Sequence, residues 1–269
     1  MILRRLRTHV ENENWFAVFV DFAIVVIGVF IGIQVANWNE ARAAERREQV
    51  LLVELREELI KNASDAKGAG EGFLVGADSA RRILARRERP LKDCVDECWN
   101  VIVDLMHASQ WQRVDINWTT YDELRRNGLP SNRDIIQALE NFQFILRQNA
   151  SALDTPPAYR TLVRQKIPIT LQDAYWANCF MIGDRIEIYL VPCEKPDGVQ
   201  IDPDTVNAIL ADRDITTTLR EWTSMARLTG ETLVESSASS KPALDILDAE
   251  ISNESDGPAR KNSIIEVRK

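Results

Sequence analysis

The longest apolar stretch of the chain lies close to its N-terminus. Residues 16 to 36 have the sequence FAVFVDFAIVVIGVFIGIQVA, in which only Asp21 and Gln34 are strongly polar. A helix through this stretch would hold the bracketing Trp15 and Trp38 roughly 34 Å apart, which matches a hydrocarbon core of about 30 Å plus its interfaces. The pattern therefore predicts a transmembrane helix. The two alternatives are the buried helix of a soluble core and a cleavable signal peptide, whose apolar part is only about 7 to 15 residues long.

Helical character continues beyond this apolar stretch. Residues 39 to 62, NEARAAERREQVLLVELREELIKN, contain no glycine or proline and are rich in alanine, leucine, glutamate and arginine. These residues favour helix, so we expect the helix to leave the membrane without a break. It should kink or break at a cluster of glycines, each of which costs about 1 kcal/mol relative to alanine in a helix. The cluster comprises Gly68, Gly70, Gly72 and Gly76.

The rest of the chain shows short helical periodicities that begin and end at recognisable signals. Thr120 and Glu123, for example, form a capping box for a short helix that ends at Gly128. Residues 179 to 193, CFMIGDRIEIYLVPC, hold two apolar runs around a glycine and an aspartate, which is typical of a hairpin. The predicted fold class is mainly α, with one N-terminal transmembrane helix, a long juxtamembrane helix, and a helical soluble domain containing at most one small hairpin.

Composition divides the chain into four parts. Residues 1–14 form a short leader, residues 15–38 the transmembrane helix, and residues 39–235 the helical domain. From residue 236 the sequence is poor in aromatic residues and rich in serine, aspartate and glutamate. Residues 236–269 are therefore predicted to be a flexible acidic tail, in which 242–251 could form a turn or two of amphipathic helix.

The cysteines form an even set of four, Cys94, Cys98, Cys179 and Cys193. In an oxidising compartment such a set predicts two disulfides, for which three connectivities exist. The closest pairings are favoured, because Cys179 and Cys193 flank the predicted hairpin and their bond would add about 3 kcal/mol of stability. Cys94 and Cys98 suit a loop or a frayed turn. Two alternatives are four reduced cysteines in a cytoplasmic domain, and a zinc site that adds His107 but has no convincing fourth ligand.

The basic residues that flank the span are nearly equal in number on its two sides and do not by themselves decide its orientation. Those before it are Arg4, Arg5 and Arg7, and those after it are Arg42, Arg46, Arg47 and Arg56. Because a short leader can stay in the cytoplasm, and because all four cysteines lie in the remainder, we expect a cytoplasmic N-terminus and a domain on the opposite side.

Three residues of the predicted span lie on one helical stripe. Asp21, Gly28 and Gly32 are spaced by seven and four residues, and the two glycines form a GxxxG motif through which a second helix can approach closely. The stripe predicts association with the protein itself or with another membrane protein, whereas the alternative is that the small residues face lipid. Asp21 either reaches the headgroup layer, where water solvates it, or pairs with a partner inside the bilayer.

Composition and motifs narrow the classes of function. With 33 basic and 41 acidic residues the net charge is -8, which excludes general binding to nucleic acid. The chain has two histidines, His9 and His107, and lacks the HExxH, GxSxG, Walker and GxGxxG motifs, so no catalytic residue, metal or cofactor is predicted. Trp111, Trp118 and Tyr121 could line a ligand groove, although aromatic residues between helices usually belong to the core.

The block NWFAVFVDFAIVVIGVFIGIQVANWNEAR, residues 14–42, resembles the amino-terminal signature DFxIVVxGVFIGxQVxNWN of a family of uncharacterised single-span inner-membrane proteins of proteobacteria. TYDELRRNGLPSNRD, residues 120–134, is similar to a second mark of that family, as is the placement of residues 176–179 and of Cys193. The resemblance implies a membrane location and a helical soluble part, and it supplies no activity or ligand. The extended acidic tail departs from the family.

These expectations combine into one predicted function. The chain should be a single-span protein of the bacterial inner membrane, with its N-terminus in the cytoplasm, that presents a helical binding or scaffolding domain to the periplasm. Its partners would be membrane lipid and, through the span, a second copy or another membrane protein. The alternative is a small-ligand sensor or an enzyme of the cell envelope, which would need convergent acid, base or metal ligands in a cleft.

Overall fold

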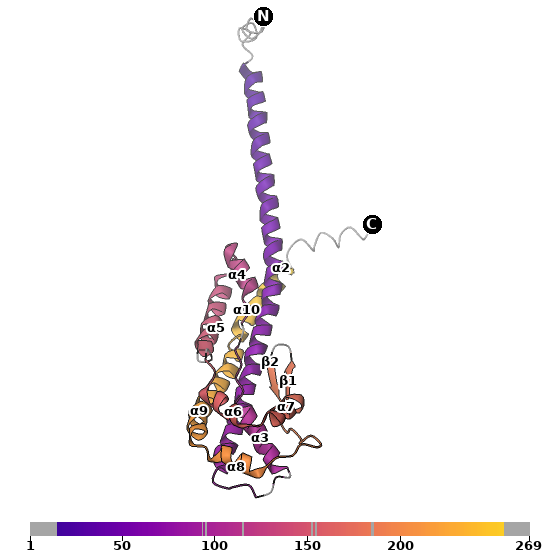
Figure 1. Ribbon diagram of the computed structural model, residues 1–269. Coiled ribbons are helices and arrows are strands. Elements are labelled where there is room, and N and C mark those ends of the chain that lie inside the picture. The colour runs from indigo at the N-terminus through magenta and orange to yellow at the C-terminus, as the bar shows by residue number, and fades with distance from the viewer. Residues whose placement is uncertain are drawn as a thin grey trace, which may run out of the picture. The chain divides into compact units, whose positions relative to one another are not determined.

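The computed structural model describes residues 15–92, 94, 96–114, 116–151, 153, 155–183 and 186–255, so the predicted leader lies outside the described residues (Figure 1). The chain divides into two compact units, Met1–Leu51 and Leu52–Lys269. The predicted mainly α fold with one small hairpin is confirmed. The elements are α2 (Trp15–Arg86), α3 (Glu97–Ala108), α4 (Thr119–Arg126), α5 (Arg133–Ser151), α6 (Ala158–Lys166), α7 (Ile169–Asn178), β1 (Phe180–Gly183), β2 (Ile186–Tyr189), α8 (Pro203–Ala211), α9 (Arg213–Ala238) and α10 (Lys241–Ser255).

The apolar part of α2 in the first unit is exposed. Among the described residues, α2 is the one helix long and apolar enough to cross a membrane, and none of its most apolar window is buried in the protein. Phe22, Val25 and Phe30, for example, are each more than 60% exposed. Such a surface is unfavourable in water, because each apolar side chain left exposed forfeits about 1.5 to 3 kcal/mol of burial energy.

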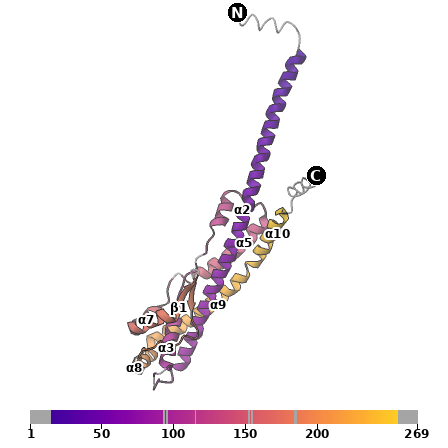
Figure 2. The same cartoon turned by 90° about the vertical axis from the view of Figure 1, so that its right-hand side faces the viewer.

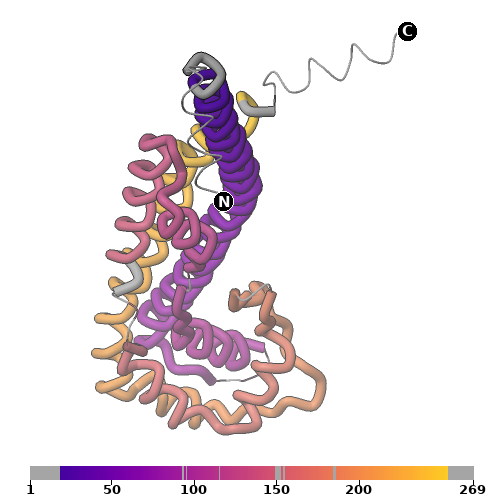
Figure 3. The backbone as a smooth tube through the Cα atoms, turned by 90° about the horizontal axis from the view of Figure 1, so that it is seen from above, coloured from indigo at the N-terminus to yellow at the C-terminus, as the bar shows by residue number. Residues whose placement is uncertain are grey.

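In the second unit, α2 continues without a break through the glycine cluster, so the break expected there does not occur. Packing against other elements outweighs the low helix propensity of glycine. At Gly70 the backbone of α9 approaches so closely that an added Cβ would lie 2.8 Å from the carbonyl oxygen of Gly230. Figures 1 and 3 show α5 and α9 on one side of this part of α2 and the hairpin with α7 on the other.

The core of the second unit forms where α3 meets the helices around it. Trp99, Ile102 and Met106 of α3 are each at most 1% exposed, and α3 packs against α6, α7 and α8. From α9, Leu219 and Trp222 join the same core, as their helical spacing predicts.

The prediction of a flexible tail from residue 236 is wrong for residues 236–255. Helix α9 extends to Ala238, and α10 packs against α5 with Ala243 and Leu247 fully buried. Asp248 also pairs with Arg56 of α2 at 2.5 Å. The spacing of the two buried residues gives α10 an apolar face despite its polar composition. Figure 2 shows α10 beside α5. Residues 256–269 lie outside the described residues.

The start of α4 differs from the predicted capping box, because Trp118 occupies the N-cap position and its own side chain makes no capping hydrogen bond. Instead Glu58, on α2, accepts hydrogen bonds from the backbone N–H groups of Thr120 at 2.9 Å and Tyr121 at 3.3 Å. One turn along α2, the amide of Asn62 exchanges two hydrogen bonds with the backbone of Asn117. Two side chains of α2 therefore position α4.

Candidate binding groove

The hairpin is closed at its base by a disulfide. Cys179, directly after α7, bonds to Cys193, and their Cα atoms lie 5.4 Å apart. The strands between them are antiparallel, with Met181 opposite Ile188 and Phe180 opposite Tyr189. The disulfide therefore joins the two chain segments at the open end of the hairpin. A two-stranded sheet of this kind would be only marginally stable alone.

The two faces of the hairpin differ. Because side chains alternate along a strand, Phe180 and Tyr189 share one face, and Met181 and Ile188 share the other. The first face packs inward: the Phe180 and Trp176 rings meet edge to face at 4.9 Å, and Tyr189 is 8% exposed. Met181 and Ile188 are 48% and 40% exposed. The hairpin thus presents an apolar outer face.

A groove of about 920 Å³ runs between the hairpin and the part of α2 that follows residue 56. Its apolar surface comes from Ile60 and Val75 of α2 and from Ile186 and Ile188 of β2. Charged residues stand along the same walls. They are Glu57, Lys61, Asp65, Lys67, Glu71 and Glu187.

Glycines of α2 allow the hairpin to come close enough to form this groove. A Cβ added at Gly68 would lie 2.8 Å from Cδ1 of Ile186, and one at Gly72 would lie 3.1 Å from Cε2 of Tyr189. Gln112 fixes β2 from the same side, because its Oε1 accepts a hydrogen bond from the backbone N–H of Glu187 at 3.1 Å. Gly68 and Gly72 thus allow the hairpin to pack closely against α2.

Beneath the hairpin lies His107, which is 1% exposed. Its ring lies between Tyr175 and Tyr189, at 5.4 and 5.7 Å, and neither ring nitrogen has a hydrogen-bond partner. Burial lowers the pKa of His107 to about 4. Burial also raises the pKa of both tyrosines. His107 is therefore a neutral core residue near pH 7.

Two arginines of α6 cap the C-terminus of α3. Arg160 donates to the carbonyl oxygen of Ser109 at 3.0 Å, and Arg164 donates to the Ser109 hydroxyl and to the side chain of Gln110, both at 2.9 Å. Burial, followed by the charge of Arg160, lowers the pKa of Arg164 to about 10. Because the carbonyls at a helix C-terminus carry partial negative charge, they compensate these two cations and give them a structural role.

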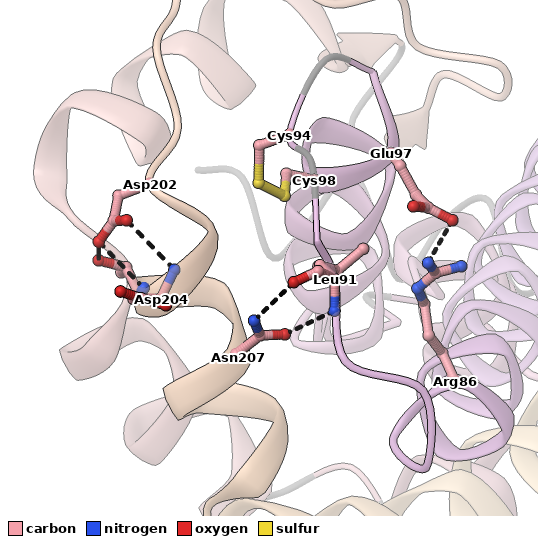
Figure 4. The surroundings of a disulfide bond; sticks show 9 residues. Arg86, Leu91, Cys94, Glu97, Cys98, Asp202, Asp204 and Asn207 are labelled. Carbon is pink, nitrogen blue, oxygen red and sulfur yellow. Dashed lines mark hydrogen bonds and ion pairs between the residues drawn. A yellow bond between two sulfur atoms is a disulfide. The ribbon is translucent and has the colours of Figure 1, made fainter.

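The second disulfide lies before α3, where Cys94 bonds to Cys98 with Cα atoms 4.9 Å apart (Figure 4). Close by, the side chain of Asn207 on α8 exchanges two hydrogen bonds with the backbone of Leu91, at 2.9 and 3.0 Å. These contacts tie the loop before α3 to α8. Both cysteine pairings are those that the sequence spacing favours. Because Cys94 and Cys98 form a disulfide, they are not available as zinc ligands.

The aromatic residues that the sequence suggested as the lining of a ligand groove do not lie beside the hairpin. Trp118 packs edge to face against Tyr121 and Phe142, at 6.0 and 5.9 Å. Trp111 lies beneath Arg113, whose guanidinium is 5.8 Å from the ring centre. None of them belongs to the residues that line the groove beside the hairpin. Within the described part of the chain, no group of three or more His, Cys, Asp or Glu side chains could hold a metal ion.

The stripe predicted for helix association lies on α2. Asp21 is exposed, and a Cβ added at Gly28 or Gly32 would meet no atom of the described residues within 4 Å. The described residues therefore leave this stripe uncovered. The side chain of Trp15 lies outside the described residues, and Trp38 is 54% exposed.

Sequence reasoning missed the groove itself, because it arises from contacts between residues more than a hundred positions apart. One available signal was the spacing of Gly68 and Gly72, since small residues four apart in a helix allow close approach of another element. No protein-family model, no curated protein and no solved structure matches the chain.

Proposed function

We propose that the chain is a single-span protein of the bacterial inner membrane whose helical domain acts in the periplasm as a binding or scaffolding module. The observation that carries the proposal is the unburied apolar segment of α2. A bilayer would remove that segment from water, and its helical backbone satisfies its own hydrogen bonds there. The resemblance to single-span inner-membrane proteins agrees with this assignment.

The disulfides support the proposed compartment. Disulfides persist in the periplasm and are rare in the cytoplasm, where thiols are kept reduced. The bond between Cys179 and Cys193 closes the hairpin that forms one wall of the groove. An oxidising compartment would therefore maintain the surface through which the domain is proposed to act.

The span would supply a second mode of association. The stripe of Asp21, Gly28 and Gly32 is open to a neighbouring helix, and close packing of backbones is what holds helices together in lipid. The partner would be a second copy or another membrane protein.

A binding role suits the groove better than a catalytic one. Its walls combine exposed isoleucines with charged side chains, a combination typical of surfaces that hold another macromolecule. The histidine beneath it is buried and neutral, and so is poorly placed to exchange protons with a substrate.

A pair of reporters tests the proposal. A fluorescent protein that matures only in the cytoplasm and an alkaline phosphatase that folds only in the periplasm are each fused after Lys269. We expect no fluorescence and high phosphatase activity in the membrane fraction. The matched control places the fluorescent protein before Met1, where it should be bright. Bright fluorescence from the C-terminal fusion, or recovery of the chain in the soluble fraction, would contradict the proposal.

A further inference from the structure

We propose that the C-terminal end of the predicted span binds the headgroup of a phosphatidylethanolamine lipid, with Arg42 holding the phosphate and Glu45 the ammonium group. This inference rests on the proposed function and deepens it, because it names the chemistry of the lipid at one end of the anchor. Three observations carry it: the stacking of Arg42 on Trp38, the place of Glu45 further along α2, and the balance of charge in this part of the helix.

The side chain of Arg42 is turned back towards the span. Its guanidinium carbon lies 3.8 Å from the centre of the Trp38 ring, which makes a cation–π contact. Among the described residues, no carboxylate forms an ion pair with Arg42. Because stacking occupies only the flat face of the guanidinium, the N–H groups along its edge can hold two oxygens of a phosphate.

The stacking places this cation at the level of lipid phosphates in the proposed membrane. Trp38 follows the apolar run of residues 16 to 36, and it is 54% exposed. Tryptophan at the end of a span lies in the headgroup layer, and side chains of a helix lean towards its N-terminus, which here is the direction of the span. The Arg42 guanidinium would therefore meet the phosphate layer from the water side.

Glu45 supplies the opposite charge on the same face of α2. It follows Arg42 by three residues, so its backbone lies about 4.5 Å further from the span. The two exposed side chains could pair at this spacing, but they do not, and no described cation pairs with Glu45. The order of charges is thus a cation near the span and an anion beyond it. An ethanolamine headgroup has the complementary order, because its ammonium lies two carbons beyond its phosphate.

The balance of charge separates this headgroup from other lipids. Residues 39–50 of α2 carry three arginines and three glutamates, so their net charge is zero and they do not concentrate lipids of net negative charge. A zwitterionic lipid suits such a segment. Between the common zwitterionic headgroups, the primary ammonium of ethanolamine donates hydrogen bonds to a carboxylate, whereas the quaternary ammonium of choline has no N–H group.

Native mass spectrometry of the full chain tests the inference. The protein is purified in a mild detergent and mixed with equal amounts of phosphatidylethanolamine, phosphatidylcholine and phosphatidylglycerol that have identical acyl chains. The mass of the complex then reports which lipids remain bound to the chain. We expect the ethanolamine lipid to be retained about fivefold more than either of the other two.

Neutral substitutions with matched controls locate the site. Arg42→Gln and Glu45→Gln should each lower retention of the ethanolamine lipid about fivefold, to the level of the choline lipid. Arg47 and Glu40 lie nine and two residues from Trp38, which places them on the opposite side of the helix. Arg47→Gln and Glu40→Gln should therefore leave retention unchanged.

An exchange of the two charges tests their order. A double variant with Arg42→Glu and Glu45→Arg has the same net charge as the parent protein but places the carboxylate nearer the span. It should lose the preference for the ethanolamine lipid. Because both residues are exposed, we expect the fold to be unchanged, and circular dichroism melting of each variant verifies this.

Three results would overturn the inference. They are equal retention of the ethanolamine and choline lipids by the parent protein, a preference that the exchange variant keeps, and displacement of the bound lipid by an equal concentration of glycerophosphoethanolamine, which is the same headgroup without acyl chains. None of these results affects the reporter fusions, so failure of the headgroup site is distinguishable from failure of the proposed membrane location.

Discussion

Replacing Glu58 by alanine tests how α2 positions the start of α4. The carboxylate is 8% exposed and accepts three hydrogen bonds, from the backbone N–H groups of Thr120 and Tyr121 and from the side chain of Asn117 at 3.1 Å. A hydrogen bond to a charged group is worth about 1.5 to 3 kcal/mol, and losing a helix cap costs about 0.5 to 2 kcal/mol. Because water can reach part of the site once the side chain is gone, we expect Glu58→Ala to lower the free energy of unfolding by about 2 to 3 kcal/mol.

The neighbouring residue offers a matched control. Glu57 carries the same side chain, but it is 69% exposed and makes only a surface pair with Arg56 at 3.2 Å. Glu57→Ala should therefore change the free energy of unfolding by about 0.5 kcal/mol or less. Urea unfolding of the full chain in mild detergent, followed by tryptophan fluorescence, measures both variants. Equal losses from the two substitutions would refute the capping role of Glu58.

Three further predictions concern the burial of His107, the disulfide between Cys179 and Cys193, and the glycine stripe of the predicted span. His107 is neutral in the folded protein, whereas in the unfolded protein its pKa is the ordinary 6.5. Its contribution to the free energy of unfolding is therefore fully present above pH 6.5 and is lost as the pH falls from 6.5 towards 4. Urea unfolding should show that the free energy of unfolding falls by about 2 kcal/mol between pH 7 and pH 5 in the parent protein and not in His107→Phe. The same pH dependence in both proteins would contradict this prediction. Replacing Cys179 and Cys193 by serine should lower the free energy of unfolding by about 3 kcal/mol, and free thiols at both positions in fresh membranes would exclude the bond in cells. In a membrane two-hybrid assay, Gly32→Ile should reduce self-association or partner recovery whereas Val29→Ile, on another face, should not, and equal signals would place the stripe against lipid.

Local patterns predict the helices of this chain well. The apolar run, the helical spacing of Leu219 and Trp222, and the cap of α8 by Asp202, whose side chain accepts from the backbone N–H groups of Asp204 and Thr205, all depend on residues close together in sequence. The hairpin also follows from two short apolar runs around one glycine. These features need no knowledge of distant partners.

The features that sequence reasoning missed depend on distant contacts. Helix propensity alone predicts a break near Gly70, but α9 packs so closely there that only a residue without a side chain fits. The polar composition of residues 241–255 suggests a mobile segment, but Ala243 and Leu247 bury one face of α10 against α5. The cap of α4 comes from Glu58, more than sixty residues earlier in the chain. A single sequence carries no pairing information of that range.

Protease protection in spheroplasts tests the central claim, a membrane-anchored domain outside the cytoplasm, most directly. Cells expressing the chain with an epitope tag before Met1 are converted to spheroplasts and treated with a protease that cannot cross the inner membrane. We expect the domain that follows the span to be digested and a small tagged fragment containing the span to remain protected. Full protection of the chain until the membrane is opened with detergent would contradict the account.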